Sequence, residues 1–431
     1  LGWGSDTCGS IRIPSAYNNL FGLRPTQGMV SRSGIVPLSH TQDIAGPLAR
    51  SVTDLAIALD ATVGADPKDA ATRAIEGRVL AHFTDSLSAS AFRGARIGVL
   101  LNYMSGDIDP EIRDTVRSAI AAMKRLGAEV MDVRVADFDS LITGSSVLNM
   151  ETRQDLIDFL ATVPNAPVSS LGAILSQGLH HEALDARLRV ADSVGVRDSV
   201  KYSAALAKQQ VLRGRFIALL DSLNLDVLVY PTMQRKPALL GEPQPGGTCQ
   251  LSAHSGLPAL SAPAGFTSDG LPVGIELLGR PFSDVRLVSL AYAFEQSGSR
   301  RRAPSTTPRL SAGHGPRPIA FTASVSTHPG SARASFIFDA LRNDLTYRLQ
   351  LVGVPAARVQ AVVLRREDGD RLRVIHRLSG PGVLSVTGHV TLSAADRGAL
   401  ADGHLLLSVF ASEHGTTPSE VRLALHGPPK R

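Results

Sequence analysis

The sequence predicts an α/β domain followed by an antiparallel β-sandwich, and three observations support this. The first 300 residues or so alternate short apolar runs with amphipathic helices, an order typical of a mixed, largely parallel sheet covered by helices. Beyond about residue 318, segments alternate apolar and polar residues, as strands with one buried face do. Between them lies a Pro-, Ser- and Arg-rich stretch. We therefore expect domains at 1–296 and 319–431, joined by a linker at 297–318.

The clearest helix is predicted at 109–127, between buried strands at 95–101 and 128–135. Asp109 can cap it, Pro110 suits its first turn, and Gly127 follows its last turn. Apolar residues recur on one face at helical spacing. This strand–helix–strand order predicts a right-handed crossover between parallel strands.

A second helix is predicted at 202–223, followed by a buried strand at 225–232. The segment 136–200 is helical in pattern but polar, and Pro164 and Pro167 interrupt it. We expect it to form a lid or a substrate-facing helical insert.

The tail contains seven segments with strand character, at a spacing typical of an antiparallel sandwich. These are 319–326, 334–339, 345–354, 359–366, 388–393, 404–412 and 420–427.

Composition excludes several classes of protein. With 43% hydrophobic and 19% charged residues, the chain is globular. The net charge is +5 with only 5% aromatic residues, and no basic, aromatic-rich face appears, so no nucleic-acid partner is expected. No apolar run is long enough to predict a membrane span, and the first residues do not resemble a signal peptide. The sequence is compatible with a homo-oligomer.

The chain contains two cysteines, Cys8 and Cys249. Their spacing fits neither a CxxC motif nor a disulfide framework, so they do not indicate the redox compartment. We expect Cys249 to be a small, buried apolar residue.

The stretch "GSDTCGSIRIP" (4–14) carries the chemistry. Its glycines allow unusual backbone conformations, so the N–H groups of Thr7, Cys8, Gly9 and Ser10 can converge on a developing oxyanion. Ser10, at the end of this nest, is then placed to attack a carbonyl carbon. The alternative is an ordinary Gly/Ser turn that caps a helix. A serine also needs a base to become a nucleophile.

Three segments resemble the amidase signature family of serine hydrolases. They are "GSDTCGSIRIPSAYNNLFGLRPTQGMVSRSGIVPLSHTQDIAGPLARSVTDLA", "LDVLVYPT" and "SGLPALSAPAGFTSDGLPVGIELLGRPFSDVRLVSLAYAFE". The resemblance covers residues 1 to about 296. It implies that Ser10 is the nucleophile and that Thr7, Cys8, Gly9 and Ser10 form the oxyanion hole. Cys8 departs from the family, which commonly has Gly there.

The resemblance also implies a Ser–Ser–Lys triad without a histidine. In the family the second serine and the lysine lie upstream of the nucleophile, so we expect them outside residues 1–431 and expect this chain alone to be inactive. Lys68, in "DPKDAAT", lies in a different family segment and is not expected to replace the lysine.

Other candidates receive structural roles. Asp43, in "TQDIAGPLARS", belongs to a motif that the family shares, and we expect it to brace the nucleophile turn through Arg12. His180 and His181 are adjacent, so they point in different directions on a helix and cannot chelate a metal together. No metal or cofactor is expected.

The tail resembles a chordin-type (CHRD) domain in "LTYRLQLVGVPAARVQAVVL" and in the segment from 388 to 427. Such domains occur mostly in exported proteins, so the resemblance favours export, with a cytoplasmic location as the alternative. The family's "HIH"-like segment is replaced in this chain by "VVLRR", which argues against a metal site.

These observations predict a hydrolase of non-peptide amide C–N bonds that acts on a small-molecule substrate through an acyl-enzyme at Ser10. One alternative is a catalytically dead scaffold that keeps an amidase shell. Another is the amidotransferase component that acts on charged tRNA, which shares the signature but is disfavoured by the tail and by the lack of a basic face.

Overall fold

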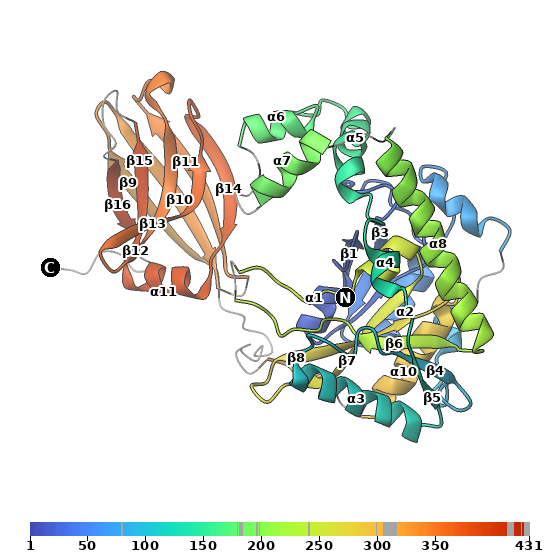
Figure 1. Cartoon of the computed structure of the whole chain (residues 1–431). Coiled ribbons are helices and arrows are strands. Elements are labelled where there is room, and N and C mark those ends of the chain that lie inside the picture. The colour runs from blue at the N-terminus through green and yellow to red at the C-terminus, as the bar shows by residue number, and fades with distance from the viewer. Residues whose placement is uncertain are drawn as a thin grey trace. The chain divides into compact units, whose positions relative to one another are not determined.

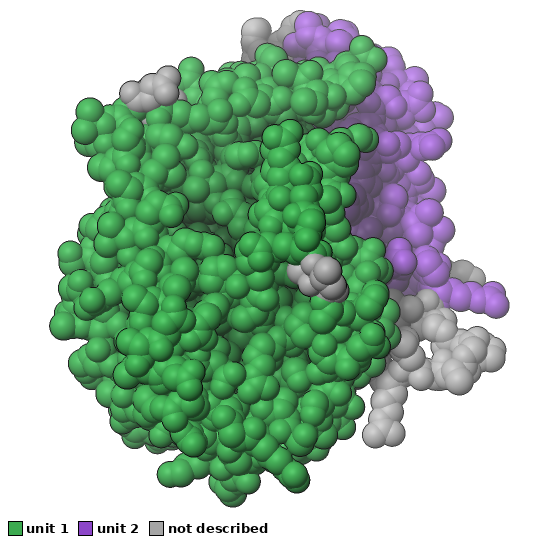
Figure 2. All heavy atoms as spheres, turned by 90° about the vertical axis from the view of Figure 1, so that its right-hand side faces the viewer, with its two compact units in different colours: residues 1–303 green, residues 304–431 purple. Residues whose placement is uncertain are grey.

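The computed structural model divides the chain into two compact units, Leu1–Ala303 and Pro304–Arg431 (Figures 1 and 2). It describes residues 1–78, 81–178, 180, 184–194, 197, 199–239, 242–298, 300–304, 317–340, 342–411, 418–423 and 425.

Unit 1 is built on an eight-stranded sheet within the described residues. In spatial order the strands are β1 (Gly2–Asp6), β3 (Ile44–Ala49), β2 (Phe21–Arg24), β7 (Ala259–Phe266), β8 (Pro272–Leu278), β6 (Val227–Pro231), β4 (Arg96–Leu100) and β5 (Glu129–Val133). The expectation of a largely parallel sheet is wrong. β4 is parallel to β5 and β6, whereas the other neighbouring pairs are antiparallel.

The tight connection between β7 and β8 explains part of this difference. The Thr267 N–H donates to the Leu271 carbonyl, so the two strands form a hairpin, which is necessarily antiparallel. The predicted crossover holds where a helix intervenes: α3 (Pro110–Arg125) joins the parallel strands β4 and β5, and Asp109 caps it with Pro110 in its first turn.

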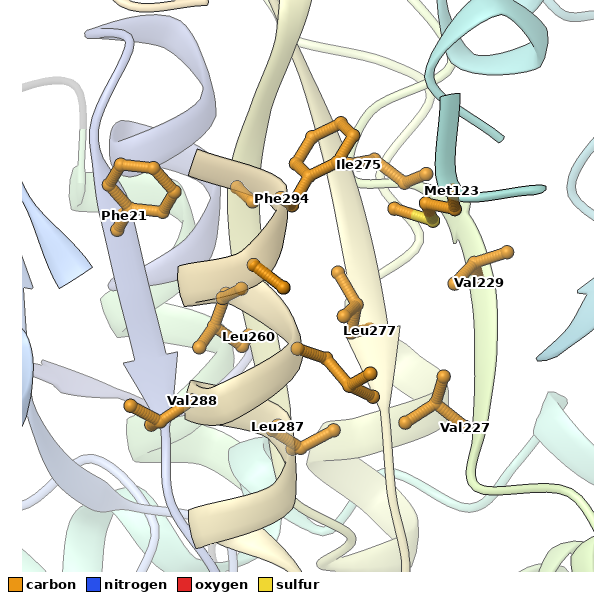
Figure 3. Packing of buried hydrophobic residues seen from close by; sticks show 14 of the residues in the cluster. Phe21, Met123, Val227, Val229, Leu260, Ile275, Leu277, Leu287, Val288 and Phe294 are labelled. Atoms are coloured by element: carbon orange, nitrogen blue, oxygen red, sulfur yellow. The ribbon is translucent and has the colours of Figure 1, made fainter. Parts of the chain in front are cut away.

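Helices cover both faces of the sheet. On one face α2 (Val52–Thr62), α3 and α10 (Asp284–Gln296) share a core with alternate strand residues such as Val227, Val229 and Leu277. Figure 3 shows Leu287 on the side of α10 that is nearer to Leu277 and Val227, and Val288 on the other side of the helix. The intervening residues Leu228, Tyr230 and Leu278 pack on the other face with α4 (Phe138–Ile142), α8 (Val200–Ser222) and α9 (Gln250–Ser255).

The predicted insert at 136–200 is helical. After α4 it contains α5 (Leu148–Ala161), α6 (Leu171–Ser176) and α7 (Asp185–Val194). Both interrupting prolines fall between α5 and α6. The Nε2–H group of His180 donates a hydrogen bond to Asp185 Oδ1, and His181 lies outside the described residues.

Unit 2 contains two four-stranded antiparallel sheets among the described residues. Their orders are β14 (Ser385–Thr391), β11 (Asp344–Val352), β10 (Ser331–Asp339), β9 (Ile319–Ser326), and β13 (Arg371–Ser379), β12 (Ala361–Asp368), β15 (Leu405–Phe410), β16 (Ser419–Leu423). Buried residues of both sheets, such as Phe336 and Leu407, belong to one apolar cluster. Whether this unit folds on its own, and its resemblance to CHRD domains, remain predictions.

Two elements of unit 2 were not predicted. β13 exposes Leu372 and Val374, so its residue pattern lacks a clear buried face. α11 (Ala394–Asp402) has a readable signal, a capping box of Ser393 with Asp396 and a left-handed Gly403 at its end.

The boundary after unit 1 lies later than predicted. Residues 300–303, assigned to the linker, belong to unit 1. The Arg300 guanidinium lies 4.0 Å from the centroid of the Phe294 ring, and that of Arg302 lies 3.8 Å from the centroid of the Phe266 ring. These stacking contacts hold the arginines against the domain surface. Residues 305–316 of the predicted linker lie outside the described residues.

Candidate active site

The predicted nucleophile lies in a short loop between β1 and α1 (Arg12–Tyr17), which we call the nucleophile loop (residues 7–11). Ser10 is exposed, and among the described residues its hydroxyl has no hydrogen-bond partner. Gly9 has φ +91°, and a Cβ there would lie 2.5 Å from Ile13 Cδ1 and 2.9 Å from Cys249 Cβ. Only glycine combines this conformation with this close packing.

One of the four predicted oxyanion donors is used within the loop. The Gly9 N–H donates to Asp6 Oδ1 at 2.6 Å, so its assignment to the oxyanion hole is not supported. In the described part of the chain, the N–H groups of Thr7, Cys8 and Ser10 have no acceptor. Three donors therefore remain for an oxyanion, and a carboxylate holds the fourth to shape the turn.

A buried ion network lies directly beneath the loop. Asp6 and Arg12 are both fully buried and are joined at 3.1 Å (Nε–Oδ2). Arg12 Nη1 also donates to Glu276 Oε1 of β8 at 2.5 Å. The Asp6 carboxylate additionally accepts the N–H groups of Gly9 and Ile11. The network thereby links both ends of the loop to the centre of the sheet.

Arg24 is the second buried cation of this network. Its guanidinium donates to Asp6 Oδ1 at 3.3 Å and to the Gln42 carbonyl at 2.8 Å. The Tyr230 hydroxyl donates to Glu276 Oε1 at 2.9 Å. Two guanidinium groups thus face two carboxylates away from water, an arrangement that is stable only while all partners are present.

Burial and charge oppose each other at these groups. Burial alone would raise the pKa of Asp6, but Arg12 and Arg24 outweigh it and hold that pKa well below its ordinary value. Burial raises the pKa of Glu276, although Arg12 opposes this. Asp6 is therefore the firmly ionised partner of the two arginines.

Asp43 braces the loop by a different route from the one predicted. The Thr7 hydroxyl donates to Asp43 Oδ1 at 2.5 Å, and the N–H groups of Leu38 and Ser39 donate to Oδ2. Arg12 instead binds Asp6 and Glu276. The carboxylate of Asp43 therefore ties the first loop residue to the segment before β3.

The two cysteines form a disulfide, which corrects the expectation that Cys249 is a free apolar residue. Cys8 and Cys249 are joined across 241 residues, with a Cα–Cα distance of 5.2 Å. Cys249 precedes α9, and its carbonyl accepts a hydrogen bond from Arg12 Nη2 at 3.3 Å. The covalent bond thus fixes the nucleophile loop to α9.

His254 of α9 is buried behind this junction and is neutral. Burial, and then the charges of Arg24 and Arg12, lower its pKa to about 4. The Ser145 hydroxyl, which donates to the Ile142 carbonyl, lies 2.7 Å from His254 Nδ1. Because that hydroxyl has one proton, Nδ1 carries the imidazole proton and donates to Ser145.

A cavity of about 980 Å³ lies between the segment that precedes β3 and the helical insert, and no residue of the nucleophile loop lines it. Asp43, Lys68, Glu151, Phe159 and Tyr202 are among its lining residues, whereas Ser10 is not. Two of its polar lining residues are hydrogen-bonded to each other, since Glu151 Oε1 accepts from the Tyr202 hydroxyl at 2.8 Å. The cavity is large enough for a small organic molecule.

Metal and membrane features are absent from the described residues. No group of three or more His, Cys, Asp or Glu side chains there could hold a metal ion. None of the described helices combines the length and apolar composition needed to cross a membrane.

Comparison with known proteins identifies the family. The family model described as Amidase matches residues 1–288. The chain belongs to the amidase signature family. The A subunit of glutamyl-tRNA(Gln) amidotransferase from Moorella thermoacetica is 33% identical over 317 residues, which are 69% of this chain and 63% of that protein.

Solved structures agree with this assignment. The native peptide amidase from Stenotrophomonas maltophilia is 33% identical with a TM-score of 0.62, over 70% of this chain and 62% of that one. An amidase family protein from Bacillus anthracis str. Ames is 27% identical with a TM-score of 0.61, over 70% of this chain and 58% of that one. The chain spans less than two thirds of the length of these relatives.

Sequence reasoning missed Asp6, Arg24, Glu276 and the disulfide. A signal exists for Glu276, which is the one charged residue in the apolar run "VGIELL" of β8. A charge at such a position needs a buried partner of opposite sign. No comparable signal exists for the cysteines, because connectivity does not follow from spacing.

Proposed function

We propose that this protein hydrolyses non-peptide amide C–N bonds through an acyl-enzyme at Ser10. The observation that carries the proposal is the exposed Ser10 hydroxyl at the end of a loop with three unpartnered N–H groups. In the first step Ser10 Oγ attacks the amide carbonyl carbon while a base takes the hydroxyl proton. The C–N bond then breaks, and the amine leaves with a proton. Water hydrolyses the resulting ester and regenerates Ser10.

The N–H groups of Thr7, Cys8 and Ser10 are the proposed oxyanion donors. They belong to the backbone, and the ion network beneath them fixes their directions before substrate binds. Such preorganised donors stabilise the charge that develops on the carbonyl oxygen and need no rearrangement during the reaction.

The base is proposed from the family resemblance, in which a lysine acts through a second serine. Among the described residues, no lysine side chain lies within hydrogen-bonding distance of Ser10. Lys236 binds Glu111 and Asp269 instead. We therefore propose that residues 1–431 alone hydrolyse amides negligibly, because triad residues act as a unit.

The substrate is proposed to be a small amide whose carbonyl reaches Ser10 while its remaining part occupies the cavity that Asp43 lines. Relatives at the same 33% identity include a peptide amidase and one component of an amidotransferase, so identity alone does not choose between them. The covalent link between Cys8 and Cys249 favours an oxidising compartment, which supports the proposal of export.

The decisive experiment assays the whole protein encoded by the gene that contains this sequence. We expect hydrolysis of aryl amides such as p-nitroanilides, lost on Ser10→Ala but kept on Ser90→Ala, a matched substitution of an exposed serine. A fluorophosphonate should label Ser10 in the parent protein. Absence of both hydrolysis and labelling would identify a catalytically dead scaffold, and glutamine-dependent amidation of charged tRNA would identify the amidotransferase alternative.

A further inference from the structure

We propose that the Cys8–Cys249 disulfide positions the oxyanion donors of the nucleophile loop, so that its reduction slows the reaction of Ser10. The inference rests on the proposed function, because it assigns a task to a bond beside the proposed nucleophile. It makes Cys8 and Cys249 positioning residues, since neither sulfur has to touch the substrate.

The disulfide is the main anchor of residue 8. Thr7 is held by Asp43, and Gly9 is held by Asp6. Between them, Cys8 makes no hydrogen bond to any other described residue, and its N–H is one of the three unpartnered donors. Without the S–S bond, the orientation of this donor would depend on its two neighbours alone.

Packing around the bond shows that α9 and the loop form a tight junction. A Cβ at Gly9 would lie 2.9 Å from Cys249 Cβ, so the loop backbone lies directly against Cys249. Arg12 Nη2 donates to the Cys249 carbonyl at 3.3 Å. Any movement of Cys249 is therefore transmitted to the loop at two points besides the sulfur.

Because Asp6 and Asp43 still hold the loop after reduction, we expect only a partial loss of activity. After reduction, the loop keeps the bonds of Asp6 and Asp43 and does not unfold. The Cys8 donor loses its fixed direction, while Thr7 and Ser10 keep theirs. Since oxyanion donors act on the transition state, we expect the maximal rate to fall and substrate binding to change little.

Reduction of the disulfide needs only an external dithiol as the source of electrons. A dithiol reductant donates two electrons and two protons to the bond, which yields the thiols of Cys8 and Cys249 and the oxidised, cyclic reductant. Cys8 is partly exposed, so the reductant can reach it. Residues 1–431 contain no other cysteine, and a double variant that lacks both cysteines assigns the effect of the reductant to this bond.

The kinetic test compares the oxidised and the reduced forms of the whole protein encoded by the gene, with the redox state verified by mass spectrometry of the linked peptides. We expect kcat to fall roughly tenfold, below the full loss of an oxyanion donor, with KM within about twofold. Oxidised glutathione should restore kcat. The Cys8→Ser/Cys249→Ser double variant should match the reduced protein and ignore the reductant. Unchanged kcat after verified reduction overturns the proposal, as does absence of the linked peptide from air-oxidised protein.

A second measurement does not depend on turnover. Backbone amide hydrogen exchange should accelerate on reduction in the peptide that covers residues 7–11, while α3 stays unchanged. If the protein hydrolyses no amide, the proposed function fails, yet faster exchange of this loop still supports the positioning role. Identical exchange in both redox states contradicts it, whatever the activity.

Discussion

The nucleophile loop and the pair of helices α6 and α7 lie in the same unit but are stabilised in opposite ways. The loop has few residues, and its anchors come from distant strands: Glu276 lies 264 positions after Arg12. α6 and α7 pack with α5 in a small cluster whose buried residues are Leu156, Leu171, Leu175 and Ala191. Their surface carries exposed ion pairs such as Arg189 with Asp185.

The difference indicates that the nucleophile loop is more rigid than α6 and α7. The groups proposed to react are fixed by buried charges and a covalent bond, whereas α6 and α7 have little apolar burial. Regions with few buried apolar contacts open at lower free energy than the core does. We therefore expect α6 and α7 to open locally before the nucleophile loop does.

The largest expected effect comes from breaking the ion network. Arg12→Ala leaves Asp6 and Glu276 buried with less compensation, so the free energy of unfolding should fall by about 3–5 kcal/mol. Urea denaturation monitored by circular dichroism measures it. A loss below about 1 kcal/mol would show that water reaches the network, and the contrast between the two regions would then be wrong.

The second-largest expected effect is a pH dependence of folding stability that His254 causes. The pKa of His254 is lowered from 6.5 to about 4 in the folded protein. The unfolded chain therefore binds a proton between these values while the folded protein does not, and stability falls as the pH drops through this window. From pH 7 to pH 5 the loss should be about 2 kcal/mol.

Denaturation of the parent protein and of His254→Gln at several pH values isolates this contribution. The variant should lack the extra loss between pH 6.5 and 4, because glutamine does not titrate. Parallel pH profiles for the two proteins would mean that folding does not change the pKa of His254.

A smaller effect is expected at the Asp43 brace. Thr7→Val keeps the shape of the side chain but removes the hydroxyl that donates to Asp43, which should cost about 1.5 kcal/mol. Thr62→Val, at an exposed helix position, is the matched control and should change the thermal midpoint little. Equal midpoints for the two variants would exclude Asp43 as an anchor.

The smallest effect is expected in the helices of the insert. Arg189→Ala removes an exposed pair between Arg189 and Asp185, spaced i, i+4 in α7, and should leave the urea midpoint nearly unchanged. It has the same chemistry as Arg12→Ala in the other region. Similar losses of stability for Arg12→Ala and Arg189→Ala would show that the two regions are not stabilised in different ways.

Local elements could be predicted from the sequence because their signals are local. The cap and Pro110 located α3, and the apolar run at 225–232 located β6. Strand direction was predicted less well, because it depends on which strands become neighbours. The alternation of strands and helices indicated parallel pairing, which holds for β4 with β5 but not for the hairpin of β7 and β8.

The candidate site was predictable where it follows a family motif, and not where it depends on distant partners. Ser10 and its loop were located from "GSDTCGSIRIP", and Asp43 from its own motif. The partner of Arg12 could not be predicted from the sequence, since Glu276 becomes its neighbour only when β8 joins the sheet. The same holds for Cys249, which reaches Cys8 through the placement of α9.

The contact between Arg12 and Glu276 has a consequence for how the protein is made. At the ordinary speed of translation, roughly 5–20 residues per second, the ribosome needs tens of seconds to proceed from Arg12 to Glu276. During this time β1 lacks the rest of its charge network, and the Cys8 thiol has no partner. Until then this segment of the emerging chain has a free thiol and unpaired charges. Chaperones and thiol oxidases would meet this segment before the domain closes around it.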